Sequence, residues 1–244
     1  GVLPVAGAAQ KWLEVARHMK RFYKDVTTTD EGGILLDGRP VKTPARAPLL
    51  LPNAAMAEAA AAEWRAQGEE IDPRSMSVTG LANAALDRVA ANPAEFAAGL
   101  AQYGETELLC YRAEEPPELV ARQAQRWDVL LDWAGTRYGV EFTRVTGIMH
   151  KPQPLSTVLR LGDAVAAANP FELAALSPIV TISGSLVIGL ALLEEAILPN
   201  DAFDAAHLDE LWQVEQWGED DLALETREIR RRDFLSACRF LELA

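Results

Sequence analysis

The fold of the first part of the chain is decided by residues 32–44, which have the sequence GGILLDGRPVKTP. The apolar run Ile34–Leu36 is followed directly by Asp37-Gly38, a dipeptide that favours a tight hairpin because both turn positions need a positive φ. Further strands are expected at residues 22–28, 41–43 and 49–51. The last of these follows Pro48, and proline has no N–H group to donate to a strand ladder. The pattern predicts a small antiparallel meander.

The rest of the chain is predicted to be helical. Asn53 suits the N-cap of a helix over residues 54–67, and Gly68 suits its end. Further helices are expected at residues 79–91, 93–103, 118–138, 156–168, 178–193, 202–217 and 220–243. Hairpin-type turn signals stop near residue 75. We therefore predict an α+β fold, with a small N-terminal β-containing domain at residues 1–75 and a larger, mostly α-helical domain at residues 76–244.

Apolar spacing identifies the expected core of the helical part. The longest uncharged run, residues 173–193, is nominally long enough to span a membrane, but serine, proline and glycine interrupt it. Its dense block, Leu186–Leu193, is therefore predicted to be a buried core helix. Two core-facing stripes are also predicted from helical spacing, namely Trp127, Leu130, Leu131 and Ala134, and Leu208, Leu211 and Trp212.

The net charge of −13 is unevenly distributed over the 244 residues. Residues 1–50 hold eight Lys/Arg against five Asp/Glu, whereas residues 194–228 hold twelve Asp/Glu against the single basic residue Arg227. Such an acidic stretch repels nucleic acid and anionic membrane surfaces. It suits a basic or amphipathic protein partner, although a merely solvated surface remains an alternative.

Sequence motifs for catalysis are scarce. His18, His150 and His207 show no metal-ligand spacing, and the chain has no phosphate-binding glycine loop, so we expect no metal, nucleotide or other cofactor. Cys110 and Cys238 cannot form a disulfide framework, and Cys110 is predicted to be a buried structural thiol. Clustered carboxylates could in principle act as acid and base, so a hydrolase remains a minor alternative. A non-enzymatic binding function is favoured.

The candidate partner-binding residues are Trp217, Gly218, Glu219, Asp220 and Asp221. They join the last two predicted helices and combine an aromatic residue, a chain reversal and three carboxylates. One interpretation is routine, with Gly218 ending one helix and the acids favouring the N-terminus of the next. The other makes Trp217 an apolar anchor and Glu219 an electrostatic hook for a basic partner. Both interpretations can hold together.

An ordered set of motifs resembles the assembly chaperones of the F-type ATP synthase. These motifs are Arg21–Lys24, Leu36–Pro44, Glu63-Trp64 with Gln67, Ile71–Pro73 with Met76 and Thr79, Leu81–Asp87, Glu107–Ala113, Gln125–Asp128 and Trp217–Asp220. The set is similar to that of the family that binds the alpha subunit of this ATP synthase (assembly factor 2). The chain departs from the family in having Glu107 in place of an aspartate, and serine in place of a proline beside Met76.

The resemblance implies a non-enzymatic chaperone with a small β-containing domain and a larger helical domain. Such a chaperone binds the free alpha subunit, covers a surface later occupied by the beta subunit, and prevents aggregation. We expect a monomer that is not a membrane protein, located in the bacterial cytoplasm, or in the mitochondrial matrix if the source is eukaryotic. A helical scaffold or adaptor for another protein remains the main alternative.

Overall fold

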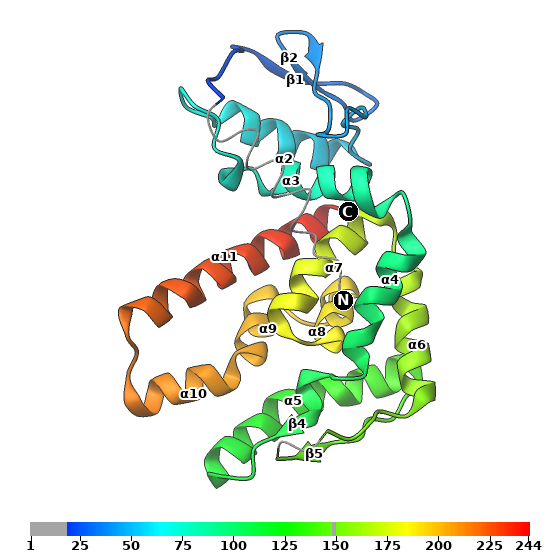
Figure 1. Ribbon diagram of the computed structural model, residues 1–244, viewed down its shortest axis with the longest axis vertical. Coiled ribbons are helices and arrows are strands. Elements are labelled where there is room, and N and C mark those ends of the chain that lie inside the picture. Colours follow the sequence, from blue (N-terminus) through cyan, green and yellow to red (C-terminus); the bar gives the residue numbers. More distant parts are fainter. Residues whose placement is uncertain (1–18, 148–149) are drawn as a thin grey trace. The chain divides into compact units, whose positions relative to one another are not determined.

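The computed structural model describes residues 19–147 and 150–244 (Figure 1). These residues form two compact units. The described part of the first comprises residues 19–96, 169–175 and 239–244, and the second comprises residues 97–168 and 176–238. The two-domain boundary near residue 75 stays a prediction. The α+β class is confirmed, because a small antiparallel sheet precedes a mostly helical remainder.

The first unit contains the predicted meander. Strands β1 (Val26–Thr28), β2 (Ile34–Leu36) and β3 (Arg39–Pro40) pair antiparallel in the order β1-β2-β3. Asp37 and Gly38 form the β2–β3 turn with φ of 47° and 78°, as the hairpin signal predicted.

The third and fourth expected strands are replaced by isolated bridges, Lys42 to Pro48 and Gly33 to Leu50. The third strand of the sheet, β3, instead lies next to the turn, at Arg39–Pro40 rather than at the expected residues 41–43. The prolines at positions 44 and 48 lack the N–H groups that a continuous ladder would need.

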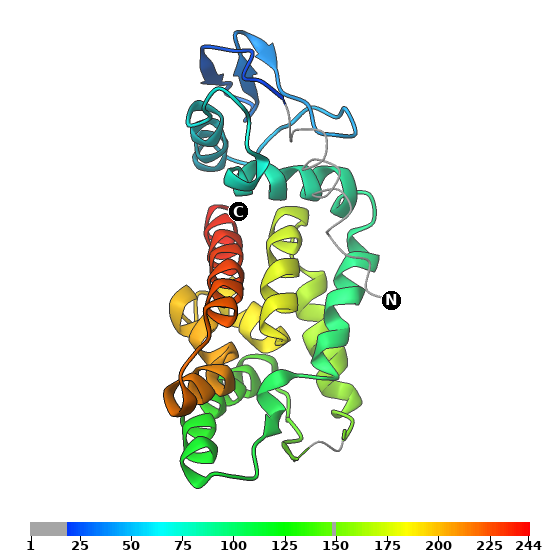
Figure 2. The same ribbon diagram turned by 60° about the vertical axis from the view of Figure 1, so that its left-hand side comes forward.

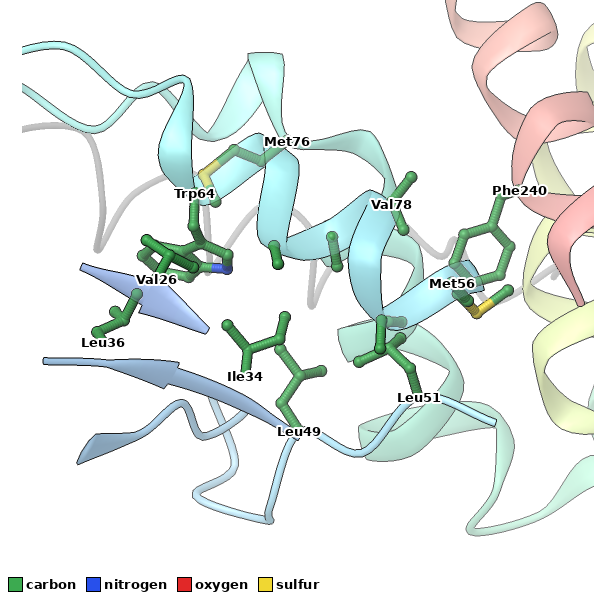
Figure 3. Packing of buried hydrophobic residues seen from close by; sticks show 14 of the residues in the cluster. Val26, Ile34, Leu36, Leu49, Leu51, Met56, Trp64, Met76, Val78 and Phe240 are labelled. Carbon is green, nitrogen blue, oxygen red and sulfur yellow. The ribbon is translucent and has the colours of Figure 1, made fainter. Parts of the chain in front are cut away.

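Helix α2 (Ala54–Arg65) packs against this sheet. Asn53 caps it as predicted, since its Oδ1 accepts a 2.8 Å hydrogen bond from the Met56 N–H. Figure 3 shows the resulting core, in which Ile34, Leu49 and Leu51 lie beneath the helix. The short helix η1 (Pro73–Ser75), α3 (Ser77–Ala84) and the π-helical turn η2 (Ala85–Val89) follow α2 along the chain.

The second unit is built mainly from helices (Figure 2). The remaining elements of the chain, of which α4, α7 and α11 each have residues in both units, are α4 (Pro93–Ala101), η3 (Gln102–Gly104), η4 (Leu108–Cys110), β4 (Tyr111–Arg112), α5 (Pro117–Tyr138), β5 (Val145–Thr146), α6 (Leu155–Ala166), α7 (Pro170–Ser183), α8 (Leu186–Leu193), α9 (Pro199–Ala206), α10 (Leu208–Trp217) and α11 (Asp221–Leu243). The two-residue parallel pairing of β4 with β5 was not predicted.

Two predicted helices are each divided in the structure. Residues 178–193 belong to α7 and α8, which are separated by Gly184 at a φ of 68° and by Ser185, whose side chain caps α8. Pro178 lies inside α7 rather than at a helix start. Residues 202–217 are likewise divided at His207, between α9 and α10.

The predicted core positions are largely confirmed. Helix α8 is buried from Leu186 to Leu192, and Trp127 and its three stripe partners on α5 are all buried. On α10 Leu208 is buried, but Leu211 and Trp212 are only half-buried. The Arg122 guanidinium covers the Trp212 ring at 4.7 Å. In the described part of the chain, no helix is both long enough and apolar enough to cross a membrane.

Candidate protein-binding site

The predicted partner-binding residues form the turn between α10 and α11, here called the α10–α11 tip (residues 217–221). Figure 1 shows the two helices joined by this short turn. Trp217, the last residue of α10, is 79% exposed. Gly218 has φ 78° and ψ −179°, a conformation essentially reserved for glycine. The chain reversal predicted at Gly218 is therefore present, and it leaves the indole outside the helix pair.

Asp220, rather than Glu219, caps the last helix. Its Oδ1 accepts a 2.8 Å hydrogen bond from the Ala223 N–H, and Asp221 is the first residue of α11. Both carboxylates lie where the helix dipole favours negative charge. Acidic residues of the tip were expected to favour the N-terminus of the last helix. Asp220 and Asp221 are the residues that do so.

Glu219 forms an ion pair within the chain. Arg227 Nη2 donates to Glu219 Oε2 at 2.7 Å, and Arg227 Nη1 contacts the other carboxylate oxygen. The Glu219 side chain is only 13% exposed and that of Arg227 only 10%. Arg227 Nη1 also lies 3.9 Å from Glu210 Oε1 on α10. Glu219 is therefore neither a free hook nor a simple cap, because its charge is compensated internally.

A small cleft lies between the two helices beside the tip. Its volume is about 250 Å³, and its lining residues are Glu210, Gln213, Val214, Trp217, Gly218, Glu219, Asp220 and Ala223. This lining mixes apolar side chains with three carboxylates, and both helices contribute to it. A long side chain with an apolar stem and a cationic end matches this combination in shape and charge.

Further apolar side chains are exposed along the start of α11. Leu222 is 73% exposed and Ile229, seven residues later on the same helical face, is 43% exposed. Exposed apolar groups within a charged surface are typical of protein interfaces. Exposed apolar side chains therefore occur both at the tip, at Trp217, and on the part of α11 that follows it.

Arg227 was not identified from the sequence as a site residue. The available signal was its position as the single basic residue among twelve acidic ones in residues 194–228. Its partner lies eight positions away across the start of α11, so helix spacing rules of three or four residues do not reveal the pair.

Several other motif residues have structural roles. Arg112 Nη2 bonds Asp128 at 2.6 Å, and its guanidinium lies 5.4 Å from the Trp127 ring centre. These contacts join β4 to α5. Glu63 accepts hydrogen bonds from the Val78 and Thr79 N–H groups, at 2.7 and 2.8 Å, and thereby caps α3.

The remaining chemically suggestive groups are engaged in packing. Cys110 and Cys238 are buried and unbridged, as predicted for Cys110, and burial raises the pKa of the Cys110 thiol to about 12. The buried His207 stacks on Phe203 at 4.0 Å, and His150 Nδ1 lies 2.8 Å from the Tyr111 hydroxyl. His18 lies outside the described residues. Among residues 19–147 and 150–244, no three His, Cys, Asp or Glu side chains are grouped as metal ligands.

Comparisons with known proteins identify clear relatives. A family model described as "ATP12 chaperone protein" matches residues 20–135. The crystal structure of Atp12 from Paracoccus denitrificans is 39% identical, with a TM-score of 0.86 over 92% of this chain and 97% of that chain. A mutant of that protein gives 40% identity and a TM-score of 0.87 at the same coverage. The Atu1473 protein of Agrobacterium tumefaciens is 42% identical, with a TM-score of 0.86 over 91% of this chain and 85% of that chain.

Proposed function

This chain belongs to the ATP12 chaperone family, and from that premise we propose that it binds the free alpha subunit of the F-type ATP synthase through the α10–α11 tip. Binding holds the alpha subunit soluble until the beta subunit replaces the chaperone. The observation that carries the choice of site is the 79% exposure of Trp217 beside an acidic cleft. Large exposed aromatic residues are frequent anchors of protein interfaces.

The physical demand on such a chaperone explains this kind of surface. A lone subunit exposes an apolar, partly charged interface that otherwise associates with wrong partners. A chaperone must cover that interface and yet release it. A few apolar anchors with polar and charged surroundings give an affinity modest enough for exchange with the true partner. We propose that this exchange needs no catalytic step and that the chaperone acts as a monomer.

The site of action follows from the partner. The alpha subunit must be met where it folds, which is the cytoplasm of a bacterium or the matrix of a mitochondrion. The acidic charge of residues 194–228 favours approach of a basic client surface over nucleic acid or anionic lipid.

Co-expression with the alpha subunit tests the proposal. The amount of soluble alpha subunit is measured alone, with the wild-type chain, with Trp217→Ala and with Leu155→Ala. Leu155 is a matched control because it is 72% exposed but lies on α6. We expect the wild type and Leu155→Ala to raise soluble alpha subunit, and Trp217→Ala to do so far less.

The possible failures are distinct. If the wild type leaves the alpha subunit insoluble, the proposed partner is wrong. If Trp217→Ala and Leu155→Ala rescue equally well, the partner can be right, but the tip is not its binding surface.

A further inference from the structure

Arg227 links three segments that surround the tip. It lies on α11, pairs through two nitrogens with Glu219 in the turn, and approaches Glu210 on α10 to 3.9 Å. Its side chain is 10% exposed, so solvent competes little for these bonds. A planar guanidinium is suited to such a bridge because it offers several donors in a fixed arrangement.

The bridge is one of two side-chain anchors that lie on either side of the exposed indole. Trp217 is 79% exposed, and as the last residue of α10 it takes its backbone position from that helix. Glu215, two residues before the indole, is bonded by Arg122 of α5 at 2.8 Å, and Glu219, two residues after it, is bonded by Arg227. The position of the turn and of α11 beside Trp217 therefore depends on the bond between Glu219 and Arg227.

We propose that Arg227 is a positioning residue of the partner-binding surface, which it preorganises by holding Glu219, and with it the turn and α11, against α10 so that the cleft beside Trp217 keeps its form. The inference rests on the proposed function of the tip. It assigns the direct contact to Trp217 and makes Glu219 part of the support. A preorganised anchor lowers the entropy lost on binding and so strengthens the complex.

The test uses variants that remove the bridge without leaving a buried charge unpaired. Glu219→Gln/Arg227→Met neutralises both partners at nearly constant size, and Glu219→Arg/Arg227→Glu exchanges their charges. Arg231→Met is the matched control, because Arg231 is on the same helix but bonds Asp204 at 3.1 Å and Asn200 at 2.7 Å. For each variant, the affinity for the alpha subunit and the rate of hydrogen exchange at the backbone amides of residues 218–224 are measured.

We expect the neutral pair to weaken binding by about tenfold and the control by less than about twofold. The charge exchange should recover most of the loss. A double-mutant cycle with Trp217→Ala separates positioning from general stability, because in that background the neutral pair should cost nothing further. Wild-type affinity in the neutral pair, or additive losses in the cycle, would overturn the inference.

Hydrogen exchange keeps the inference testable if the alpha subunit is the wrong partner. Absence of binding by the wild type would defeat the proposed function by itself. Faster exchange at residues 218–224 in the neutral pair, with no change in Arg231→Met, would still support the positioning role. Unchanged exchange would refute it.

Discussion

Replacing Glu107 by glutamine should make stability less sensitive to pH. Glu107 is fully buried, and its Oε2 accepts a 3.0 Å hydrogen bond from the Val187 N–H at the start of α8. Burial raises the pKa of this carboxyl from 4.5 to about 7, although hydrogen bonds from Ser185 and backbone N–H groups act in the opposite direction. The folded protein therefore binds a proton at Glu107 more tightly than the unfolded chain does.

The sign and size of the effect follow from linkage. Because the folded-state pKa is raised, the favourable contribution of Glu107 is complete below about pH 4.5 and is lost as the pH rises to about 7. The shift corresponds to about 3 kcal/mol in total, of which roughly 2 kcal/mol falls between pH 5 and pH 8. Glutamine does not titrate, so the stability of Glu107→Gln relative to wild type should rise by roughly 2 kcal/mol over that interval.

Urea unfolding at pH 5, 6.5 and 8, followed by far-ultraviolet circular dichroism, measures this difference. Glu105→Gln is the control, because Glu105 is an exposed carboxylate two residues earlier, and its effect should stay within about 0.5 kcal/mol at each pH. A Glu107→Gln difference that is constant with pH, or that falls as the pH rises, would refute the account of a buried and reluctantly ionised carboxyl.

Two substitutions test the packing of the second unit. Leu190 is 1% exposed, so Leu190→Asp should lose several kcal/mol and yield insoluble or unfolded protein; soluble protein with an unchanged melting temperature would contradict the burial of α8. Glu219→Lys should cost roughly 2 kcal/mol or more in thermal unfolding, because it opposes a second cation to Arg227, whereas Asp221→Lys on the exposed start of α11 should cost less than about 1 kcal/mol. Equal melting temperatures for these two lysine variants would contradict the Glu219–Arg227 pair.

Local features of this protein could be predicted from the sequence. Asp37-Gly38 specifies a turn through its own backbone preferences, and Asn53 caps α2 through a hydrogen bond to a residue three positions later. The burial of Leu186–Leu192 followed from a continuous apolar block. Each of these signals lies within a few residues of the structure it determines, so no knowledge of distant segments is needed. The composition of the tip, an aromatic residue followed by glycine and three acids, was visible in the same way.

Only the tertiary structure determined which distant groups meet. Glu107 contacts the N-terminus of α8 across 80 residues, and β4 pairs with β5 from more than 30 residues away. At the tip, the sequence identified Glu219 as an acid near a helix start, but its bonding to Arg227 depends on the path of the turn and the rotation of α11. A local pattern constrains backbone conformation and the burial of a face. The pairing of two side chains also requires that their backbones be placed within a few ångströms, and the packing of the whole unit decides that placement.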